Sequence, residues 1–334
     1  MSPRIVKLKV LDARIPTTNS RKMEVLTEYN NRIKGYKGEK SLEFYLDPLI
    51  QSKDYHVFHE IRLLSGKYYF QIDFLILCHK FALALEVKKR SRDWYFDEFN
   101  QAYLLFDGAK EKIQNPVAQA KLQSKKLKQW LDEHQCEEVP IHYLFVNSHE
   151  KSKITCEDGN DQFKNMCNSE ALIDKIELIE KFYKEEKLTR QDVRKIKRLL
   201  LTKHTPDDPD ILKYFNFTPK DLLPGVQCPK CDSLPMKYHY GVWTCLHCKE
   251  KSKTAHIKAI EDYFLLIKPS ITNSELRHFL QIDSIKSANN ILKSLNLPYI
   301  GNRKGRVYYR PTTPICKRDH SEIAKWQIKL RSGK

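Results

Sequence analysis

Two apolar runs separated by a polar pair form the clearest pattern in the chain. Residues 70–77 ("FQIDFLIL") and 81–88 ("FALALEVK") are long enough for buried strands, and residues 55–63 form a further strand pattern before them. We expect these segments to form an antiparallel meander. Charged residues interrupt the apolar pattern: Asp73 lies inside the first run, and Glu86 and Lys88 close the second.

Outside this meander, the pattern predicts several helices and one more strand. Helical spacing of apolar residues favours helices at about 38–46, 116–134 and 169–202, the last of which splits near Thr189. Residues 140–147 ("PIHYLFVN") indicate another buried strand. Residues 1–30 look basic and irregular. These elements together indicate an α+β fold with a central mixed sheet.

A two-residue loop between the first two apolar runs would bring their charged residues together. If His79 and Lys80 form the loop, Asp73 lies opposite Glu86, and Lys88 projects from the same face. His-Lys is an unfavourable pair for such a turn, so the register is open by a residue or two.

Two neighbouring carboxylates repel each other unless a cation neutralises them, and Mg²⁺ is commonly held by one or two carboxylates with water and phosphate. A lysine beside them would orient water or offset charge in phosphodiester cleavage. The pattern is therefore typical of a metal-dependent nuclease. The alternative is that Asp73 and Glu86 end their strands and pair with Arg62, Lys88 or Lys89.

Four motifs in order extend this pattern. Gly-x-x-Gly-Glu at 35–39 precedes "QIDFLIL" and "LEVKKR", and Asn-Pro-x-x-Gln follows at 115–119. Over residues 32–147 the chain resembles the nuclease-related domain (NERD) family, which is placed within the PD-(D/E)xK restriction-endonuclease-like fold. Ile72 stands where the superfamily motif has proline.

The resemblance implies a role for each matching residue. It makes Asp73 and Glu86 ligands of Mg²⁺ or Mn²⁺ and Lys88 the catalytic lysine. It places Glu39 in the site as a further acid and Gln119 beside the metal or the substrate. Without the family, the sequence favours Glu39 as a capping acid in the first turn of a helix, and for Gln119 a solvated helix position is equally plausible.

Two C-x-x-C pairs form a separate module. Cys228 and Cys231 precede Cys245 and Cys248, with thirteen residues between the pairs. This spacing predicts a ribbon around a structural Zn²⁺, because cysteine fills all four positions and leaves none for water. Aromatic and basic residues interleave in the ribbon, either to contact nucleic acid or a partner protein or, for Trp243 and Tyr240, to form its small core.

The segment after the ribbon predicts a winged-helix-like module. Helix patterns at 256–267, 274–281 and 285–295 precede a hairpin at 297–310 with a basic tip. The alternative is a three-helix packing module. The candidate nucleic-acid contacts are Lys286, Asn290 and Lys293 on the third helix and Arg303, Lys304 and Arg306 in the hairpin.

Composition supports a polyanionic partner. The 334 residues carry a formal net charge of +17, and residues 301–334 hold ten Lys or Arg against two acids. We expect DNA, with RNA as an alternative substrate and a non-catalytic DNA-binding accessory as an alternative function. No signal peptide or membrane span is expected, which favours the cytoplasm. Many nucleases of the implied fold dimerise, so the resemblance allows a homodimer.

These patterns divide the chain into seven expected parts. They are an N-terminal extension (1–30), a NERD nuclease-like domain (31–150), a helical region (151–203), a linker (204–227), a zinc ribbon (228–252), a winged-helix-like domain (253–312) and a basic tail (313–334).

Overall fold

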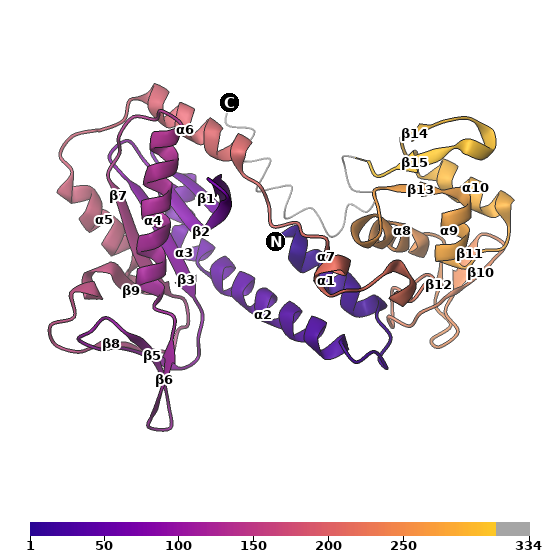
Figure 1. The fold of residues 1–334 in the computed structure, drawn as a ribbon, viewed down its shortest axis with the longest axis horizontal. Helices are drawn as coiled ribbons and strands as arrows, with labels where there is room; N and C mark the ends of the chain where they lie inside the picture. Colours follow the sequence, from indigo (N-terminus) through magenta and orange to yellow (C-terminus); the bar gives the residue numbers. More distant parts are fainter. Residues whose placement is uncertain (312–334) are drawn as a thin grey trace. The chain divides into compact units, whose positions relative to one another are not determined.

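A computed structural model of the chain describes residues 1–311 (Figure 1). The predicted basic tail, 313–334, lies outside the described residues. The chain folds into two compact units. One consists of residues 31–207. The other combines residues 3–30 with residues 208–311.

A five-stranded mixed sheet forms the centre of the 31–207 unit, in the order β1-β2-β3-β7-β9. The first three strands are antiparallel, as expected, and β3, β7 and β9 run parallel. The strands are β1 (His56–Ser65), β2 (Tyr68–Leu77), β3 (Ala82–Lys88), β7 (Ile141–Asn147) and β9 (Met166–Asn168).

Helices cover both faces of this sheet. Leu42 and Leu46, at the start of α3, pack with alternate residues of the sheet such as Phe74 and with Ile176 of α5. On the other face, α4 lies across β3 and β7 (Figure 1). The helices are α2 (Lys22–Ser41), α3 (Glu43–Gln51), α4 (Pro116–Glu133), α5 (Leu172–Phe182) and α6 (Arg190–Lys203).

Local sequence sets the ends of two of these helices. Pro116 occupies the first turn of α4, where its missing N–H is not needed, and the Asn115 side chain accepts hydrogen bonds from the backbone N–H groups of Val117 and Ala118. Thr189 and Asp192 form a capping box at the start of α6. This box explains the split that the sequence predicted near Thr189.

The register of β2 and β3 is the one expected from a two-residue loop. Phe74 pairs with Leu85 and Leu77 with Ala82, so the same register places Asp73 opposite Glu86. Tertiary contacts hold the unfavourable His-Lys turn. The carbonyl of His79 accepts hydrogen bonds from the backbone N–H groups of Lys187 and Leu188, at 2.8 and 2.9 Å.

A second, four-stranded sheet has the order β6-β5-β4-β8. Its strands are β4 (Asp93–Phe96), β5 (Ala102–Phe106), β6 (Ala109–Ile113) and β8 (Ile154–Cys156). Its Trp94 and Phe96 pack against Phe145 of the central sheet. We expected a helical region from residue 151 onward, and for residues 151–171 this is wrong. These residues contain β8 and β9, with only the short 3₁₀ turns Asp161–Asn165 and Ser169–Ala171.

The other unit begins with a helix where the sequence indicated irregular structure. Helix α1 (Pro3–Arg14) buries Leu8 and Leu11 against Ile211 and Phe215. Ile211 begins the short helix α7 (Ile211–Tyr214), and Phe215 follows it. Residues 208–222 thus pack in a core with the N-terminal helix, which differs from the expected linker. Arg14 and Asp262 form a buried ion pair at 2.8 Å in the same unit.

Two small sheets and three helices complete this unit. The ribbon strands are β10 (Lys237–His239), β11 (Val242–Thr244) and β12 (Lys251–Ser252), preceded by the 3₁₀ turn Pro219–Asp221. The helices are α8 (Ala255–Leu266), α9 (Asn273–Leu280) and α10 (Ile285–Ser294), with a sheet β13-β15-β14 made of Ser270–Thr272, Val307–Tyr309 and Tyr299–Ile300.

One apolar core joins the ribbon to these helices. Trp243 is fully buried with Ile260 and Leu276, so it forms core as expected, whereas Tyr240 is 93% exposed and the expectation that it belongs to the core is wrong. The expected hairpin is present as β14 and β15, with the 3₁₀ turn Arg303–Gly305 at its tip. Among residues 1–311, no helix has the length and apolar content that crossing a bilayer requires.

Candidate functional site

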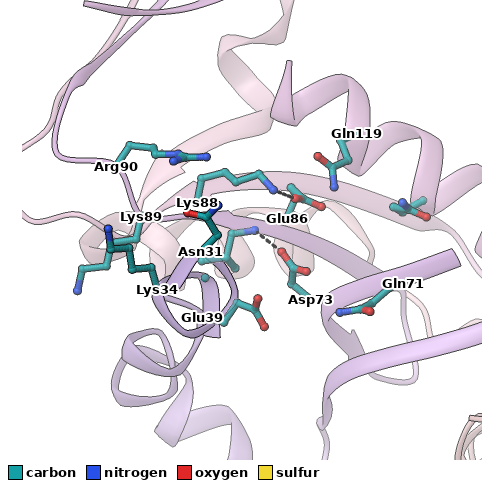
Figure 2. A pocket seen from close by; sticks show the side chains of 13 residues that line it. Asn31, Lys34, Glu39, Gln71, Asp73, Glu86, Lys88, Lys89, Arg90 and Gln119 are labelled. Atoms are coloured by element: carbon teal, nitrogen blue, oxygen red, sulfur yellow. Dashed lines mark hydrogen bonds and ion pairs between the residues drawn. The ribbon is translucent and has the colours of Figure 1, made fainter. Parts of the chain in front are cut away.

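A pocket of about 540 Å³ lies in the 31–207 unit, and all five candidate catalytic residues line it (Figure 2). Four separate elements supply them. Glu39 comes from α2, Asp73 from β2, Glu86 and Lys88 from β3, and Gln119 from α4. Residues up to 80 positions apart in the chain, which the sequence grouped by motif alone, thus converge on one cavity.

The two strand carboxylates are held differently. Asp73 accepts a hydrogen bond through Oδ2 from the backbone N–H of Val87, at 2.9 Å. Glu86 is 2% exposed and accepts a hydrogen bond from the Lys88 ammonium through Oε1. The ion-pair alternative from the sequence therefore describes Glu86 and Lys88, but this pair lies inside the pocket and not at a solvated strand end.

All three carboxyl groups have elevated pKa values. Burial raises the pKa of Asp73 to about 7, with Glu39 adding to the shift. Burial, and then the neighbouring Asp73, raises the pKa of Glu86 to about 8. Burial raises the pKa of Glu39 to about 8, with contributions from Glu60 and Glu86. Gathered acids with raised pKa values in a cleft are typical of a functional site.

Lys88 is the cation that pairs with these acids. Burial alone would lower its pKa, but Glu86 and then Asp73 outweigh that effect, and the net shift is upward. Lys88 therefore carries its positive charge at neutral pH. Without a second cation, the raised pKa values leave Asp73 about half protonated and Glu86 and Glu39 largely protonated at pH 7, and a divalent cation bound in the pocket would favour their ionised forms.

His59 does not line the pocket but contacts one of the residues that do, Glu39. Its Nε2 lies 2.9 Å from Glu39 Oε2, and its ring stacks on Phe74 with centroids 4.4 Å apart. Burial lowers the pKa of His59, which favours the neutral imidazole, and a hydrogen bond joins this ring to Glu39. The local sequence pattern placed His59 in a strand and nothing more. Its contact with Glu39 depends on the packing of α2, which the local pattern does not predict.

Gly38 allows α2 to approach the end of β3. A Cβ atom at this position would lie 2.7 Å from the Cβ of Lys89. A Cβ at Gly35, one turn earlier, would meet nothing within 4 Å. Of the two motif glycines, Gly38 is therefore the one that the packing around the pocket requires, and it sets how closely Glu39 approaches the strands.

Cationic and amide side chains flank the carboxylates on opposite sides. Figure 2 shows Lys34, Lys89 and Arg90 on one side, and Gln71 and Gln119 on the other. Lysine and arginine are suited to phosphate groups, whereas amides donate and accept directed hydrogen bonds. Polar and charged side chains thus predominate among the lining residues, and the pocket is better suited to a charged, hydrogen-bonding substrate than to an apolar one.

The donor chemistry of this pocket fits a hard divalent cation. Asp73 and Glu86 would hold Mg²⁺ or Mn²⁺ together with water and substrate oxygens, since magnesium is usually bound by few protein ligands. Among residues 1–311, one set of at least three His, Cys, Asp or Glu residues has all its ligand atoms within 4.8 Å of one another. That set lies outside this pocket.

That set consists of the four predicted cysteines, Cys228, Cys231, Cys245 and Cys248. Two pairs of sulfur atoms, Cys228 with Cys248 and Cys231 with Cys245, are each 3.6 Å apart. A tetrahedral ion with Zn–S distances of about 2.3 Å separates its sulfur atoms by about 3.8 Å. The spacing fits structural Zn²⁺, while His239 and His247 are not part of the set.

The candidate nucleic-acid contacts lie on α10 and at the β14–β15 hairpin. Lys286, Asn290 and Lys293 are exposed on α10, and Arg303 is exposed at the hairpin tip. Arg306 is half-buried, with its guanidinium 4.2 Å from the centre of the Tyr299 ring. The side chain of Lys304 lies outside the described residues.

Comparison with known families bears on the pocket directly. Residues 34–148 match the family model of the nuclease-related domain, NERD. The NERD region contains all five candidate catalytic residues and indicates a nuclease-related function. It is about a third of the chain, so the match leaves the remaining residues without an assignment. No curated protein and no solved structure matches the chain.

Proposed function

We propose that the 31–207 unit is a metal-dependent nuclease that hydrolyses phosphodiester bonds in DNA. The observation that carries the proposal is the convergence of Asp73, Glu86 and Lys88 with Glu39 and Gln119 in one pocket. Asp and Glu-x-Lys on adjacent strands, with helices flanking a mixed sheet, also support placing the unit in the PD-(D/E)xK restriction-endonuclease-like fold.

Asp73 and Glu86 would hold Mg²⁺ or Mn²⁺, which would supply Lewis-acid stabilisation of the charge that develops on the phosphate. Lys88 offsets part of the same charge and orients the attacking water through its ammonium protons. The Val87 N–H fixes one oxygen of Asp73, which leaves the other oxygen for the cation. Because Glu86 is 2% exposed, its carboxylate keeps one orientation toward the pocket.

The remaining residues position substrate or protons. Gln119 would donate its amide to a phosphate oxygen from the α4 side of the pocket. Glu39 and His59, which are joined by a hydrogen bond, would accept or return a proton at the edge of the site. Lys34, Lys89 and Arg90 would contact the phosphates that flank the scissile one.

We propose that the second unit binds DNA and brings it to the pocket. Its helices and the β13-β15-β14 sheet support a winged-helix-like module in which α10 enters the major groove and the hairpin contacts phosphates. The four-cysteine ribbon would hold structural Zn²⁺ and share its core with these helices.

Cleavage of labelled DNAs tests the nuclease directly. Linear, circular, single-stranded and forked DNA would be incubated with the full chain and Mg²⁺ or Mn²⁺, beside Glu86→Ala, Lys88→Ala and Glu137→Ala. Glu137 is exposed and outside the pocket, so it serves as the matched control. We expect cleavage by the wild type and the control, and binding without cleavage by the two pocket variants.

Binding of every DNA form without cleavage by the wild type, with zinc retained, would overturn the enzymatic proposal. The same assay with structured RNA as competitor separates a DNA nuclease from an RNA nuclease. Each measurement requires a salt series, since a chain with a net charge of +17 binds either polymer at low salt.

A further inference from the structure

One face of β2 continues from the pocket to the exposed end of the strand. Alternate residues of a strand project from the same face, so Tyr69, Gln71 and Asp73 form one row. Asp73 and Gln71 line the pocket, and Tyr69 follows them with 42% of its surface exposed. We call Tyr69, Gln71 and Asp73 the β2 row. It ends in an aromatic ring and begins at a proposed metal ligand.

The neighbouring strand fixes the aromatic end of this row. Arg62 pairs with Gln71 across β1 and β2, and its guanidinium lies 3.8 Å from the centre of the Tyr69 ring. Nη1 of Arg62 also donates a hydrogen bond to the carbonyl of Thr205, at 3.1 Å. The guanidinium is therefore held against one face of the ring, and the row presents a preformed stack of arginine and tyrosine.

Helix α4, on the same side of the pocket as Gln71, supplies a buried amide oxygen that has no hydrogen-bond partner. Gln123 lies one turn after Gln119 on α4, and its Oε1 atom is buried without a hydrogen bond. A buried acceptor of this kind is unfavourable unless a donor reaches it. Together with Gln71, the two α4 glutamines give this side of the pocket three amides suited to base or sugar groups.

We propose that the β2 row is a track for an unpaired DNA strand, with one base stacked at Tyr69 and Arg62. This inference rests on the proposed nuclease, which places the scissile phosphate at Asp73 and Glu86. At about 3.4 Å per residue, Tyr69 lies about 14 Å along the strand from Asp73, so the stacked base belongs to a nucleotide near the cleaved bond and not to the cleaved one.

The contacts favour a single strand over a duplex. Bases in a duplex stack on one another and present only their edges, whereas an unpaired base offers a face to an aromatic ring or a guanidinium. The cationic side of the pocket, with Lys34, Lys89 and Arg90, holds the backbone phosphates, and the row on the other side takes the bases. The expected substrate is therefore single-stranded DNA or the unpaired arm of a fork.

Photo-crosslinking locates the strand without requiring cleavage. The full chain would be irradiated in EDTA with a single-stranded DNA that carries 5-iodouracil, and the modified peptide would be sequenced. We expect a crosslink at Tyr69 that is absent in Tyr69→Ala. Tyr68 is a matched control, since it is the adjacent tyrosine, 77% exposed, and projects from the other face of β2. The Tyr68→Ala variant should retain the crosslink.

Cleavage rates give the second measurement. We expect Tyr69→Ala to lower kcat/KM for single-stranded DNA about tenfold, the loss typical of one base-stacking contact, and Tyr69→Phe to restore it. The Tyr68→Ala variant should remain within about twofold of the wild type. Any cleavage of blunt duplex DNA should change little in all three variants, because no base reaches Tyr69 there.

The outcomes separate this inference from the proposed nuclease. Cleavage of single strands that is unaffected by Tyr69→Ala, with no crosslink in β2, would overturn the track and leave the nuclease standing. A specific crosslink at Tyr69 without cleavage under any metal would support the track and refute the nuclease. A ribonucleotide probe that crosslinks more efficiently than its DNA counterpart would overturn the assignment to DNA.

Discussion

The Asp73 carboxylate accepts a hydrogen bond from the backbone N–H of Val87, which joins β2 to β3 at the point where both strands enter the pocket. An asparagine at position 73 keeps an oxygen for this N–H but loses the negative charge. We expect Asp73→Asn to remain folded, to bind DNA and to cleave at least about a hundredfold more slowly. Thermal unfolding, binding and cleavage measured on one preparation test this expectation.

Asp73→Ala provides the comparison for that result. It removes the charge and also leaves the Val87 N–H without its partner, so we expect the same loss of cleavage together with a lower melting temperature. Equal cleavage by Asp73→Asn and the wild type would show that the carboxylate charge has no part in the reaction.

The raised pKa values predict that metal-free protein loses stability as the pH rises. Folded Glu86 has a pKa of about 8, against an ordinary value of 4.5. Between these values the folded state retains a proton that the unfolded state has released, so the free energy of unfolding falls as the pH rises through this window. We expect the melting temperature of the 31–207 unit in EDTA to be lower at pH 8 than at pH 5.

Glu86→Gln should remove part of this dependence, because its amide does not ionise. At pH 8 in EDTA we expect it to melt roughly 3–6 °C above the wild type, with a smaller difference at pH 5. Adding Mg²⁺ should stabilise the wild type at pH 8 and have little effect on the variant. A wild-type melting curve that does not change with pH would contradict the raised pKa.

Gly38 and Gly35 make a matched pair within α2. Alanine at Gly38 would bring its Cβ to 2.7 Å from the Cβ of Lys89, which forces α2 away from β3 and shifts Glu39. We expect Gly38→Ala to lower both the melting temperature and the cleavage rate. Gly35→Ala has open space and a helical backbone, so it should be neutral or stabilising by up to about 1 kcal/mol.

Removal of zinc should affect one unit and spare the other. Cys228 and Cys245 are buried in the core that also contains Ile260 and Leu276 of the neighbouring helices. We expect Cys245→Ser to lose the zinc and to melt the unit that contains α8–α10, while the pocket variants keep one zinc per chain. Metal analysis and hydrogen exchange across both units measure this, and zinc retained by Cys245→Ser would contradict it.

The α10 lysines predict a salt-dependent contribution to DNA binding. Lys286 and Lys293 are exposed on this helix. If each contacts one phosphate, the double substitution to alanine should weaken binding at all sequences and reduce the slope of log K against log salt by about 2. A double variant with an unchanged slope would place the DNA elsewhere on the protein.

Local sequence predicted the central strands and, with the register open by a residue or two, the meeting of Asp73 with Glu86 across a two-residue loop. It did not explain why His79 and Lys80 turn so tightly. That turn depends on the N–H groups of Lys187 and Leu188, more than a hundred positions away. Glu39 and Gln119 came from family motifs, and the pocket they share depends on helix packing that no local pattern encodes.

The N-terminal segment shows the limit of local patterns more clearly. The local pattern around Leu8 and Leu11 did not predict a buried helix, because the residues that bury them, such as Ile211 and Phe215, lie about 200 positions later. His59 was missed for a related reason, since its contact with Glu39 joins two elements that the sequence does not connect.

The second unit is built from two separate stretches of the chain, and this has a consequence for its synthesis on the ribosome. Its first helix emerges some 200 residues before the segments that cover it, whereas residues 31–207 form an uninterrupted stretch. Domains generally fold as they are completed, so the nuclease-like unit can form while Leu8 and Leu11 are still uncovered. The pocket would then be assembled before the chain gains the module proposed to deliver DNA to it.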